Sequence, residues 1–276
     1  ADAAIFDIEI PQNEKCVPEQ DDPFCLDLVW DSVLIACGAG LYGSALIAKN
    51  VFGGDDYDSS KKYHKSDVNA FDRPFMNEYN HTLDNLGTVT CALTFIALPA
   101  ALFGGEAAVG NFSNSNLLEA AVMLGEAALF TNGIKDWIKL SVQRERPYMY
   151  FDERDKDGLE NNDFEYSFLS GHTANAFMGA TFTTYVFCNY FPDSKLKWPV
   201  IATSYLLASG TGALRMSSGN HFFTDVLAGA AMGSACGFLV PSVHHVIAER
   251  NNSTKKNDKA PQVLVTPYGI NVGIKF

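Results

Sequence analysis

Apolar residues are gathered in six long stretches, and polar segments separate them. The stretches are roughly 29–48, 86–104, 117–140, 173–191, 199–214 and 224–248. Each is long enough for a helix, and strand-like alternation is scarce before the tail. Around Pro267 and Gly269 the tail shows two short alternating runs, which favour extended chain. The pattern predicts an all-α fold with a six-helix core bundle and a short extended C-terminal tail.

The chain is expected to form one main domain. Its 276 residues contain no Pro/Gly/Ser-rich linker that would divide the middle. We expect a polar N-terminal segment over 1–28, a helical domain over 29–250 and a C-terminal tail over 251–276.

The apolar stretches leave open whether the chain crosses a membrane. A spanning helix needs about 20 predominantly apolar residues, whereas Asp31, Glu119 and Glu126 interrupt the first and third stretches. A long uncharged run is found over 85–105, and it contains Pro99. The Lys and Arg residues of the loops indicate no orientation. Both a soluble exported protein and a six-pass membrane protein are possible, and we favour membrane association.

The charge balance excludes a general nucleic-acid partner. The chain has 20 Lys and Arg against 32 Asp and Glu, a net charge of −12, whereas binding to a phosphate backbone depends on basic surface. In such an acidic chain, any local gathering of cations is informative.

The N-terminal region indicates an exported protein. The sequence opens with Ala1, and its first ten residues, ADAAIFDIEI, lack the basic and apolar regions of a signal peptide. We therefore expect a mature product from which a targeting segment has been removed, acting in the periplasm or on the outer side of a membrane. Cys16 and Cys25 lie in a polar stretch and could form a disulfide in an oxidising compartment. Four cysteines in apolar runs are interpreted as small buried hydrophobes: Cys37, Cys91, Cys188 and Cys236.

The first polar cluster is KLSVQRERP, residues 139–147. Lys139 and Arg146 are seven residues apart, or two helical turns, which predicts that both cations lie on one face of a helix that Pro147 ends. The alternative is that they are ordinary solvated residues at a helix end.

The second cluster is LSGHT, residues 169–173. Ser170 and Gly171 precede an apolar helix that begins near Thr173, so their backbone N–H groups belong to a helix N-terminus, which can bind an anion. His172 would lie beside that anion, unless it is a capping or surface histidine.

The third cluster is RMSSGNHFFTD, residues 215–225. His221 and Asp225 are spaced i, i+4, so one helical turn would place a carboxylate beneath an imidazole and fix its tautomer. Arg215 adds a cation. The alternative is an ordinary surface His/Asp pair.

Taken together, the three clusters supply several cations, a helix N-terminus and two imidazoles. These are the groups that phosphoryl transfer requires.

The order and spacing of these motifs resemble a known family. The pattern Lys-x6-Arg-Pro, Ser-Gly-His and Arg-x5-His-x3-Asp, over residues 139–225, resembles the type 2 phosphatidic acid phosphatase (PAP2) superfamily, which includes class A acid phosphatases and vanadium haloperoxidases. Leu169 and Leu214 depart from the family pattern, which usually has Pro and Ser there.

The resemblance implies a helical bundle of the PAP2/haloperoxidase type and a role for each motif residue. His221 would be the nucleophile that forms a phosphohistidine, Asp225 would orient it, and His172 would protonate the leaving alcohol and then activate water. The phosphate ligands would be Lys139, Arg146, Ser170, Gly171 and Arg215. No metal or other cofactor is expected, and vanadate should inhibit as a phosphate mimic.

We therefore expect a metal-independent phosphatase that hydrolyses a phosphate monoester, with a lipid phosphate or pyrophosphate favoured over other small phosphorylated molecules. The alternatives are a vanadium-dependent haloperoxidase and a non-catalytic membrane-embedded binding protein. Two further features are given little weight. Residues 153–163 partly match a calcium loop, and His244 and His245 are interpreted as complementing the dipole at the end of the last helix.

Overall fold

The computed structural model describes residues 22–53, 57–258, 262–266 and 269–273. Within these residues, six helical rods correspond to the six apolar stretches, so the predicted all-α six-helix core is confirmed. The rods are α1 (Leu28–Phe52), α2 (His81–Ala92) continued by a π-helical turn (Leu93–Ala97) and α3 (Leu98–Ala108), α4 (Asn114–Val142), α6 (Gly171–Tyr190), α7 (Lys197–Ser217) and α8 (Phe223–Asp258).

The remaining elements are short. The segment between α4 and α6 contains α5 (Lys156–Glu160) and 3-10 turns at Pro147–Tyr150 and Asp163–Glu165, and the segment between α1 and α2 contains 3-10 turns at Lys65–Asp67 and Arg73–Phe75. In the tail, β1 (Gln262–Thr266) pairs antiparallel with β2 (Gly269–Gly273), in agreement with the predicted extended tail. The last helix continues to Asp258, beyond the expected boundary at 250.

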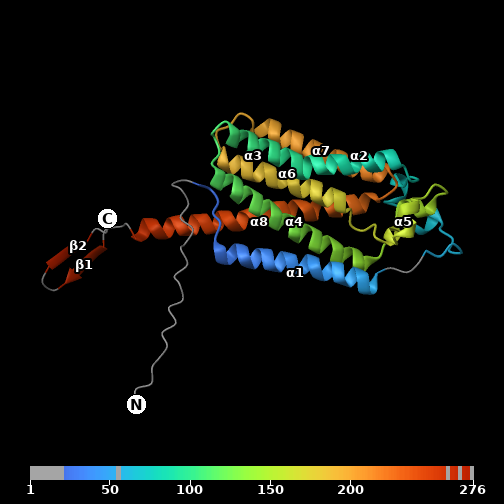
Figure 1. Ribbon diagram of the computed structural model, residues 1–276, viewed down its shortest axis with the longest axis horizontal. Coiled ribbons are helices and arrows are strands. Elements are labelled where there is room, and N and C mark those ends of the chain that lie inside the picture. Colours follow the sequence, from blue (N-terminus) through green and yellow to red (C-terminus); the bar gives the residue numbers. More distant parts are fainter. Residues whose placement is uncertain (1–21, 54–56, 259–261, 267–268, 274–276) are drawn as a thin grey trace, which may run out of the picture.

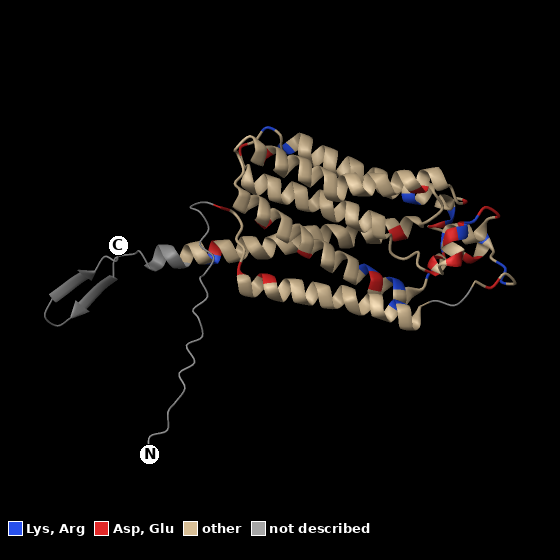
Figure 2. Ribbon diagram, in the orientation of Figure 1, with Lys and Arg blue, Asp and Glu red and all other residues tan. Residues whose placement is uncertain are grey.

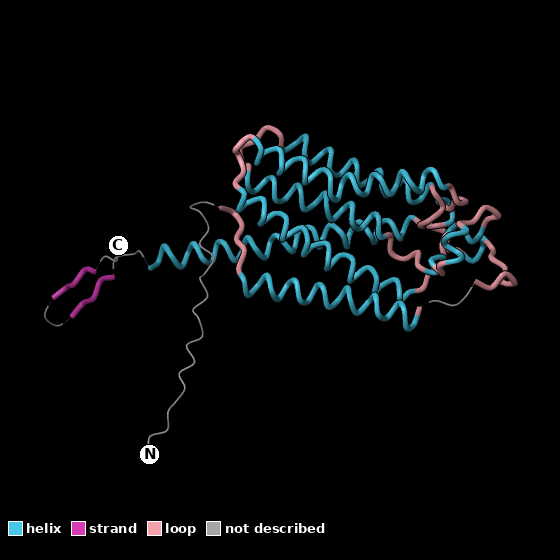
Figure 3. The backbone as a smooth tube through the Cα atoms, viewed as in Figure 1, coloured by secondary structure: helices cyan, strands magenta, loops and turns pink. Residues whose placement is uncertain are grey.

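The helices run side by side, and their connections lie at two ends of the bundle (Figures 1 and 3). Helix α6 is central: it packs against α4, α7, α8 and the π-helical turn. Large side chains from α3, α4 and α6 form the main core beside it, among them Phe103, Met123, Phe182 and Phe187. The central position of α6 explains why its sequence is rich in Ala and Gly, since small residues let neighbouring backbones approach closely.

Charged residues gather at the end of the bundle that carries α5, while the helical shafts are mostly uncharged (Figure 2). Among the residues that the structure describes, four segments are long and apolar enough to cross a membrane: Leu28–Phe52, His81–Ala108, Asn114–Tyr150 and Phe223–Ser253. Their outer faces expose large apolar side chains, including Ile47, Val89, Ile96, Leu239 and Val246. Because water-soluble monomers rarely expose apolar surface on this scale, these helices support membrane association.

The cysteine interpretations have different outcomes. The pairing of Cys16 with Cys25 lies outside the described residues, because Cys16 does. Cys91 and Cys236 are buried as expected, and Cys188 is half-buried. The burial expected for Cys37 is wrong: it lies on an exposed face of α1. That face is apolar because it belongs to a candidate membrane span, and an apolar neighbourhood in the sequence does not distinguish this from a core.

Gly179, at the centre of α6, is expected to have no room for a larger side chain. A Cβ atom there would lie 2.6 Å from Phe95 Cα and 2.8 Å from Thr94 O, which are backbone atoms of the π-helical turn. Gly179→Ala should therefore destabilise the protein by about 1–3 kcal/mol, because the backbone must move. Gly104→Ala is the matched control, since nothing lies within 4 Å of a Cβ there. Thermal unfolding in detergent compares them, and equal melting temperatures would contradict this packing.

Candidate active site

One cavity of about 360 Å³ lies at the charged end of the bundle. Six of the eight predicted site residues line it: Lys139, Arg146, Gly171, His172, Arg215 and His221. They come from the end of α4, the start of α6, the end of α7 and the loops that follow α4 and α7. The three polar clusters, which are far apart in the sequence, therefore meet around one space.

Lys139 and Arg146 do not share a helix face, so that expectation is wrong. Helix α4 ends at Val142, and Gln143 adopts a left-handed conformation with φ 46°. Arg146 thus lies in the following loop, and Lys139 is in the last turn. Both still line the cavity, because the loop folds back over the helix end. The Lys139 ammonium donates a 2.7 Å hydrogen bond to the Tyr166 carbonyl.

Carboxylates hold the two arginines of the cavity. The Arg146 guanidinium pairs with Asp163 and donates a 2.9 Å hydrogen bond to Asn220 Oδ1, while Arg215 pairs with Asp84. Burial raises the pKa of the Asp163 carboxyl, but the nearby Arg146, Lys139 and Lys49 outweigh this and hold it below its ordinary value. Neither carboxylate was predicted, because no local spacing links it to its arginine.

His221 is anchored by a backbone carbonyl. Its Nδ1 lies 2.8 Å from the Ser167 carbonyl, which can only accept, so Nδ1 carries the proton and Nε2 carries the lone pair. Burial, followed by the nearby Arg146, Arg215 and Lys139, lowers the pKa of His221 well below its ordinary value. The ring is thus held neutral, with an unprotonated Nε2, in a residue that lines the cavity.

The low pKa of His221 predicts a pH-dependent stability. In the unfolded chain the ring takes up a proton near its ordinary pKa of about 6.5, whereas the folded ring stays neutral to much lower pH. The contribution of the buried neutral ring to the free energy of unfolding is therefore complete above about pH 6.5 and is lost as the pH falls below that value. Wild-type protein should lose stability relative to His221→Gln between pH 7 and 5, which melting temperatures at several pH values would measure. A constant difference would contradict the assigned shift.

Asp225 lies behind His221 and is not its direct hydrogen-bond partner. The predicted helical i, i+4 arrangement is wrong, because α8 begins at Phe223 and leaves His221 in the preceding loop. Asp225 Oδ2 is 3.6 Å from His221 Nδ1, beyond a hydrogen bond, and accepts 2.5 and 2.8 Å bonds from the Ser167 hydroxyl and the Phe222 N–H. Asp225 is thus connected to His221 indirectly, through Ser167, whose hydroxyl bonds Asp225 and whose carbonyl bonds His221 Nδ1.

Arg144, which is not among the site residues predicted from the sequence, links this network to the segment between α1 and α2. Its guanidinium forms ion pairs with Asp225 at 2.6 Å and with Asp72 at 2.7 Å, and both carboxylates are fully buried. Burial raises the pKa of Asp72, but hydrogen bonds from Arg144, Asn69 and Thr224 outweigh this and leave it below its ordinary value. The arginine was visible in KLSVQRERP, but the family pattern assigns it no role.

The start of α6 forms one wall of the cavity. Ser170 caps the helix, its hydroxyl lies 2.8 Å from the Thr173 hydroxyl, and its side chain is buried behind the cavity. Gly171 begins the helix, two residues earlier than expected. His172 lines the cavity, with Nε2 3.2 Å from the Thr88 hydroxyl.

The structure also describes residues 153–163 and the two neighbouring histidines of α8. Within residues 153–163, a short helix forms over Lys156–Glu160, and Asp155 and Asp163 line the cavity. The helix-dipole interpretation of His244 and His245 is wrong, because α8 continues to Asp258 and both residues lie well inside it. His244 is fully buried and contacts Glu126, and His245 lies 2.7 Å from the Pro23 carbonyl.

Comparisons with known proteins agree with the motifs. The family model of the PAP2 superfamily matches residues 120–248. A PA-phosphatase related-family protein of Dictyostelium discoideum is 28% identical over 184 aligned residues, with 64% of this chain and 65% of that protein covered. The match thus spans just under two thirds of the length of this relative.

Two solved structures are also similar. A transmembrane PAP2-type phosphatidylglycerolphosphate phosphatase from Bacillus subtilis is 22% identical, with 75% of this chain and 96% of that chain covered and a TM-score of 0.46. LpxE of Aquifex aeolicus is 24% identical, with 61% and 90% covered and a TM-score of 0.39. All three motifs fall inside residues 120–248, the region that matches the PAP2 superfamily model.

Proposed function

We propose that this protein is a PAP2-type phosphatase that hydrolyses phosphate monoesters without a catalytic metal. One observation carries the proposal: three buried or half-buried cations and two imidazoles line the same cavity, namely Lys139, Arg146, Arg215, His172 and His221. A phosphoryl group needs positioning and neutralisation of its equatorial oxygens, which these cations and the N-terminus of α6 supply. The match of residues 120–248 to the PAP2 superfamily model and the phosphatase-related relative support the same chemistry.

The reaction proceeds in two displacements. The Nε2 lone pair of His221 attacks phosphorus, the bond from phosphorus to the alkoxy oxygen breaks, and His172 gives a proton to the leaving alcohol. Water then attacks the phosphohistidine, His172 takes a proton from that water, and the bond from phosphorus to nitrogen breaks to release phosphate. Asp225 contributes as a positioning residue, through the Ser167 segment described above.

A lipid phosphate is the favoured substrate class. The cavity lies at one end of helices whose outer faces are apolar and long enough to cross a membrane. A substrate whose acyl chains stay in the bilayer would present its phosphate at that end. The Bacillus subtilis neighbour is named for a lipid phosphate, phosphatidylglycerolphosphate.

The test is phosphate release by the purified full chain in detergent. We expect hydrolysis of a lipid phosphate such as phosphatidic acid in mixed micelles, slower hydrolysis of a water-soluble aryl phosphate, inhibition by vanadate and no loss of initial rate in EDTA. A protein that releases no phosphate from either substrate would contradict the proposal. Faster turnover of the aryl phosphate would contradict the substrate class while leaving the phosphatase chemistry in place.

The side of the membrane is part of the proposal. Figure 1 shows the start of α1 and the segment that carries α5 at opposite ends of the bundle. Cys25 lies just before α1, and Asp155 and Asp163, on either side of α5, line the cavity, so Cys25 and the cavity lie at opposite ends. If the helices span a membrane, the cavity and Cys25 face opposite sides of it. A cavity on the outer side is therefore incompatible with a Cys25 disulfide formed in an oxidising outer compartment. We place the cavity on the outer side, and hydrolysis of a membrane-impermeant phosphate monoester by intact cells tests this. Hydrolysis that requires cell lysis would contradict it.

A further inference from the structure

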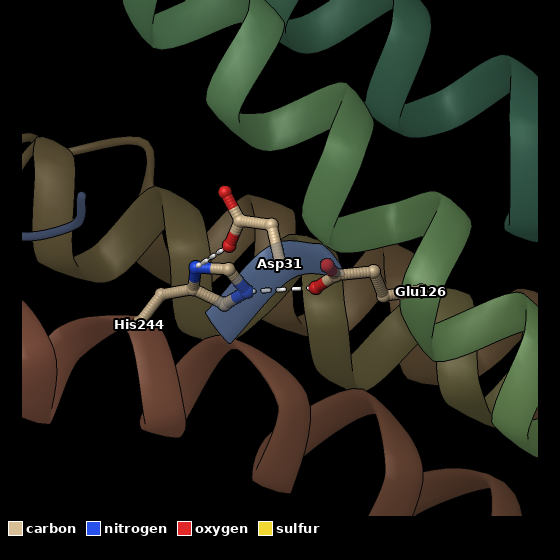
Figure 4. Close-up of side chains that lie close together, drawn as sticks. All are labelled: Asp31, Glu126 and His244. Carbon is tan, nitrogen blue, oxygen red and sulfur yellow. Dashed lines mark hydrogen bonds and ion pairs between the residues drawn. The ribbon is translucent and has the colours of Figure 1, made fainter. Parts of the chain in front are cut away.

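A second group of polar side chains is buried between three helices, away from the catalytic cavity. It consists of Asp31 in the first turn of α1, Glu126 in the middle of α4 and His244 in α8 (Figure 4). Their exposed fractions are 9%, 1% and 0%. One ligand atom from each lies within 4.8 Å of the others. The group is thus compact, ionisable and almost closed to solvent.

The hydrogen bonds around His244 leave acceptors without donors. Nε2 lies 2.7 Å from Glu126 Oε2, and since an ionised carboxylate can only accept, the ring donates its Nε2–H there. Nδ1 lies 3.2 Å from the Cys25 carbonyl, which can only accept, and 3.5 Å from Asp31 Oδ1. In the metal-free protein Nδ1 therefore also carries a proton, and the ring is an imidazolium that faces two carboxylates. Asp31 Oδ1 and Glu126 Oε1 are buried with no hydrogen-bond partner.

Three atoms that can bind a metal ion lie close together at this point, namely Asp31 Oδ1, the Cys25 carbonyl oxygen and, once it has lost its proton, His244 Nδ1. Two carboxylates share one imidazolium here, which leaves one negative charge uncompensated, and a buried carboxylate oxygen that lacks a hydrogen-bond partner costs free energy. A divalent cation that replaces the Nδ1 proton compensates both carboxylates and gives the Asp31 oxygen a partner, and the displaced proton is released to solvent. The unpaired Asp31 oxygen, in a residue nine-tenths buried, is the observation that points to a ligand.

We propose that this cluster binds a divalent transition-metal ion of the Zn²⁺ class, with Asp31 Oδ1 and His244 Nδ1 as side-chain ligands. Zinc bound to nitrogen and oxygen at about 2.0–2.2 Å in a tetrahedron separates its ligands by roughly 3.4 Å, close to the 3.2 and 3.5 Å found around Nδ1. Imidazole and carboxylate together suit zinc better than Mg²⁺ or Ca²⁺, which prefer oxygen ligands alone.

Glu126 is the positioning residue of this site. A histidine that binds a metal usually donates its other ring N–H to a carboxylate or carbonyl, which fixes the tautomer and strengthens the ligand. The 2.7 Å contact between Nε2 and Glu126 Oε2 has this geometry. The ion would tie the first turn of α1 to α8. This role is structural and does not depend on the proposed phosphatase activity.

Zinc binding to the purified full chain tests the proposal. After treatment with a chelator and removal of the chelator, added Zn²⁺ should bind at about one ion per chain, measured by elemental analysis, and should raise the melting temperature. Asp31→Asn and His244→Gln should lose this binding and the thermal shift. Glu126→Gln should retain it with affinity weakened about 10–100-fold.

Two variants serve as matched controls. Glu119→Gln alters another buried carboxylate of α4, which accepts a 2.8 Å hydrogen bond from Tyr190, and His245→Gln alters the neighbouring imidazole. Both should bind zinc like the wild type. Zinc binding that Asp31→Asn leaves intact would overturn the proposal, and so would a wild-type melting temperature that zinc does not move. In the latter case a proton on Nδ1 would satisfy the cluster. If His244→Gln does not fold, Asp31→Asn at the rim decides.

Discussion

His221→Gln should reduce kcat for phosphate release by on the order of 10⁴-fold or more, because it removes the proposed nucleophile and the loss of such a group is rarely compensated. The neutral ring is held by the Ser167 carbonyl at 2.8 Å and has 1% exposure, so no water or neighbouring side chain can take its place without rearrangement. Glutamine retains a polar end group of similar reach. The folded bundle should therefore survive, and the loss should appear in chemistry rather than in expression.

The intermediate itself provides the sharper measurement. Alkaline quenching of wild-type protein with ³²P-labelled substrate should trap an acid-labile phosphoenzyme, and peptide mapping should place the label on residue 221. His221→Gln should show no label, whereas His245→Gln, far from the cavity, should be labelled like the wild type. A labelled His221→Gln protein, or one that still turns over at the wild-type rate, would remove His221 as the nucleophile and return the question to His172.

The helices could be predicted from the sequence because hydrophobic periodicity and length report burial in any apolar surroundings. The same signal cannot tell a protein core from a lipid-facing surface, since both select the same residues. Cys37 shows this: it lies in an apolar run and is exposed on α1. The six rods were therefore predictable, while the central position of α6 follows from packing against three other helices, which no single stretch encodes.

The site could be predicted to the extent that chemistry is carried by local motifs. Lys139 and Arg146 were placed together on the argument of a continuous helix, and they do meet, although the helix ends at Val142. Their meeting depends on a loop that folds back over the helix end, so the correct outcome rested on the motif and not on the geometry assumed for it.

The residues that the sequence did not reveal are the partners of buried charges. Asp84 and Asp163 neutralise the two cavity arginines from positions in other elements. The sequence separation between Arg215 and Asp84 is 131 residues. His244 was interpreted as an end-of-helix residue because the end of α8 was placed too early. Such partners become visible when tertiary contacts bring distant carboxylates to a buried cation.

Arg144→Met should cause the largest loss of stability among single substitutions near the site. The arginine bridges Asp72 and Asp225, both fully buried, at 2.7 and 2.6 Å, and it packs over the Phe222 ring at 3.9 Å. Methionine keeps much of the packing but leaves two buried carboxylates without their cation, which costs about 3–5 kcal/mol. The melting temperature in detergent should fall by roughly 10 °C.

The same substitution should also lower activity, because Asp225 bonds the Ser167 hydroxyl and Ser167 supplies the carbonyl that holds His221. Arg73→Met is the matched control: Arg73 lies in the same segment as Asp72, is exposed, and donates only to the backbone carbonyls of Ser66 and Val68 among its described hydrogen bonds. It should change stability by less than about 1 kcal/mol. If Arg144→Met melts like Arg73→Met, the bridge does not stabilise the fold. If it melts early yet retains wild-type kcat below that temperature, the link from Arg144 to His221 fails while the ion bridge stands.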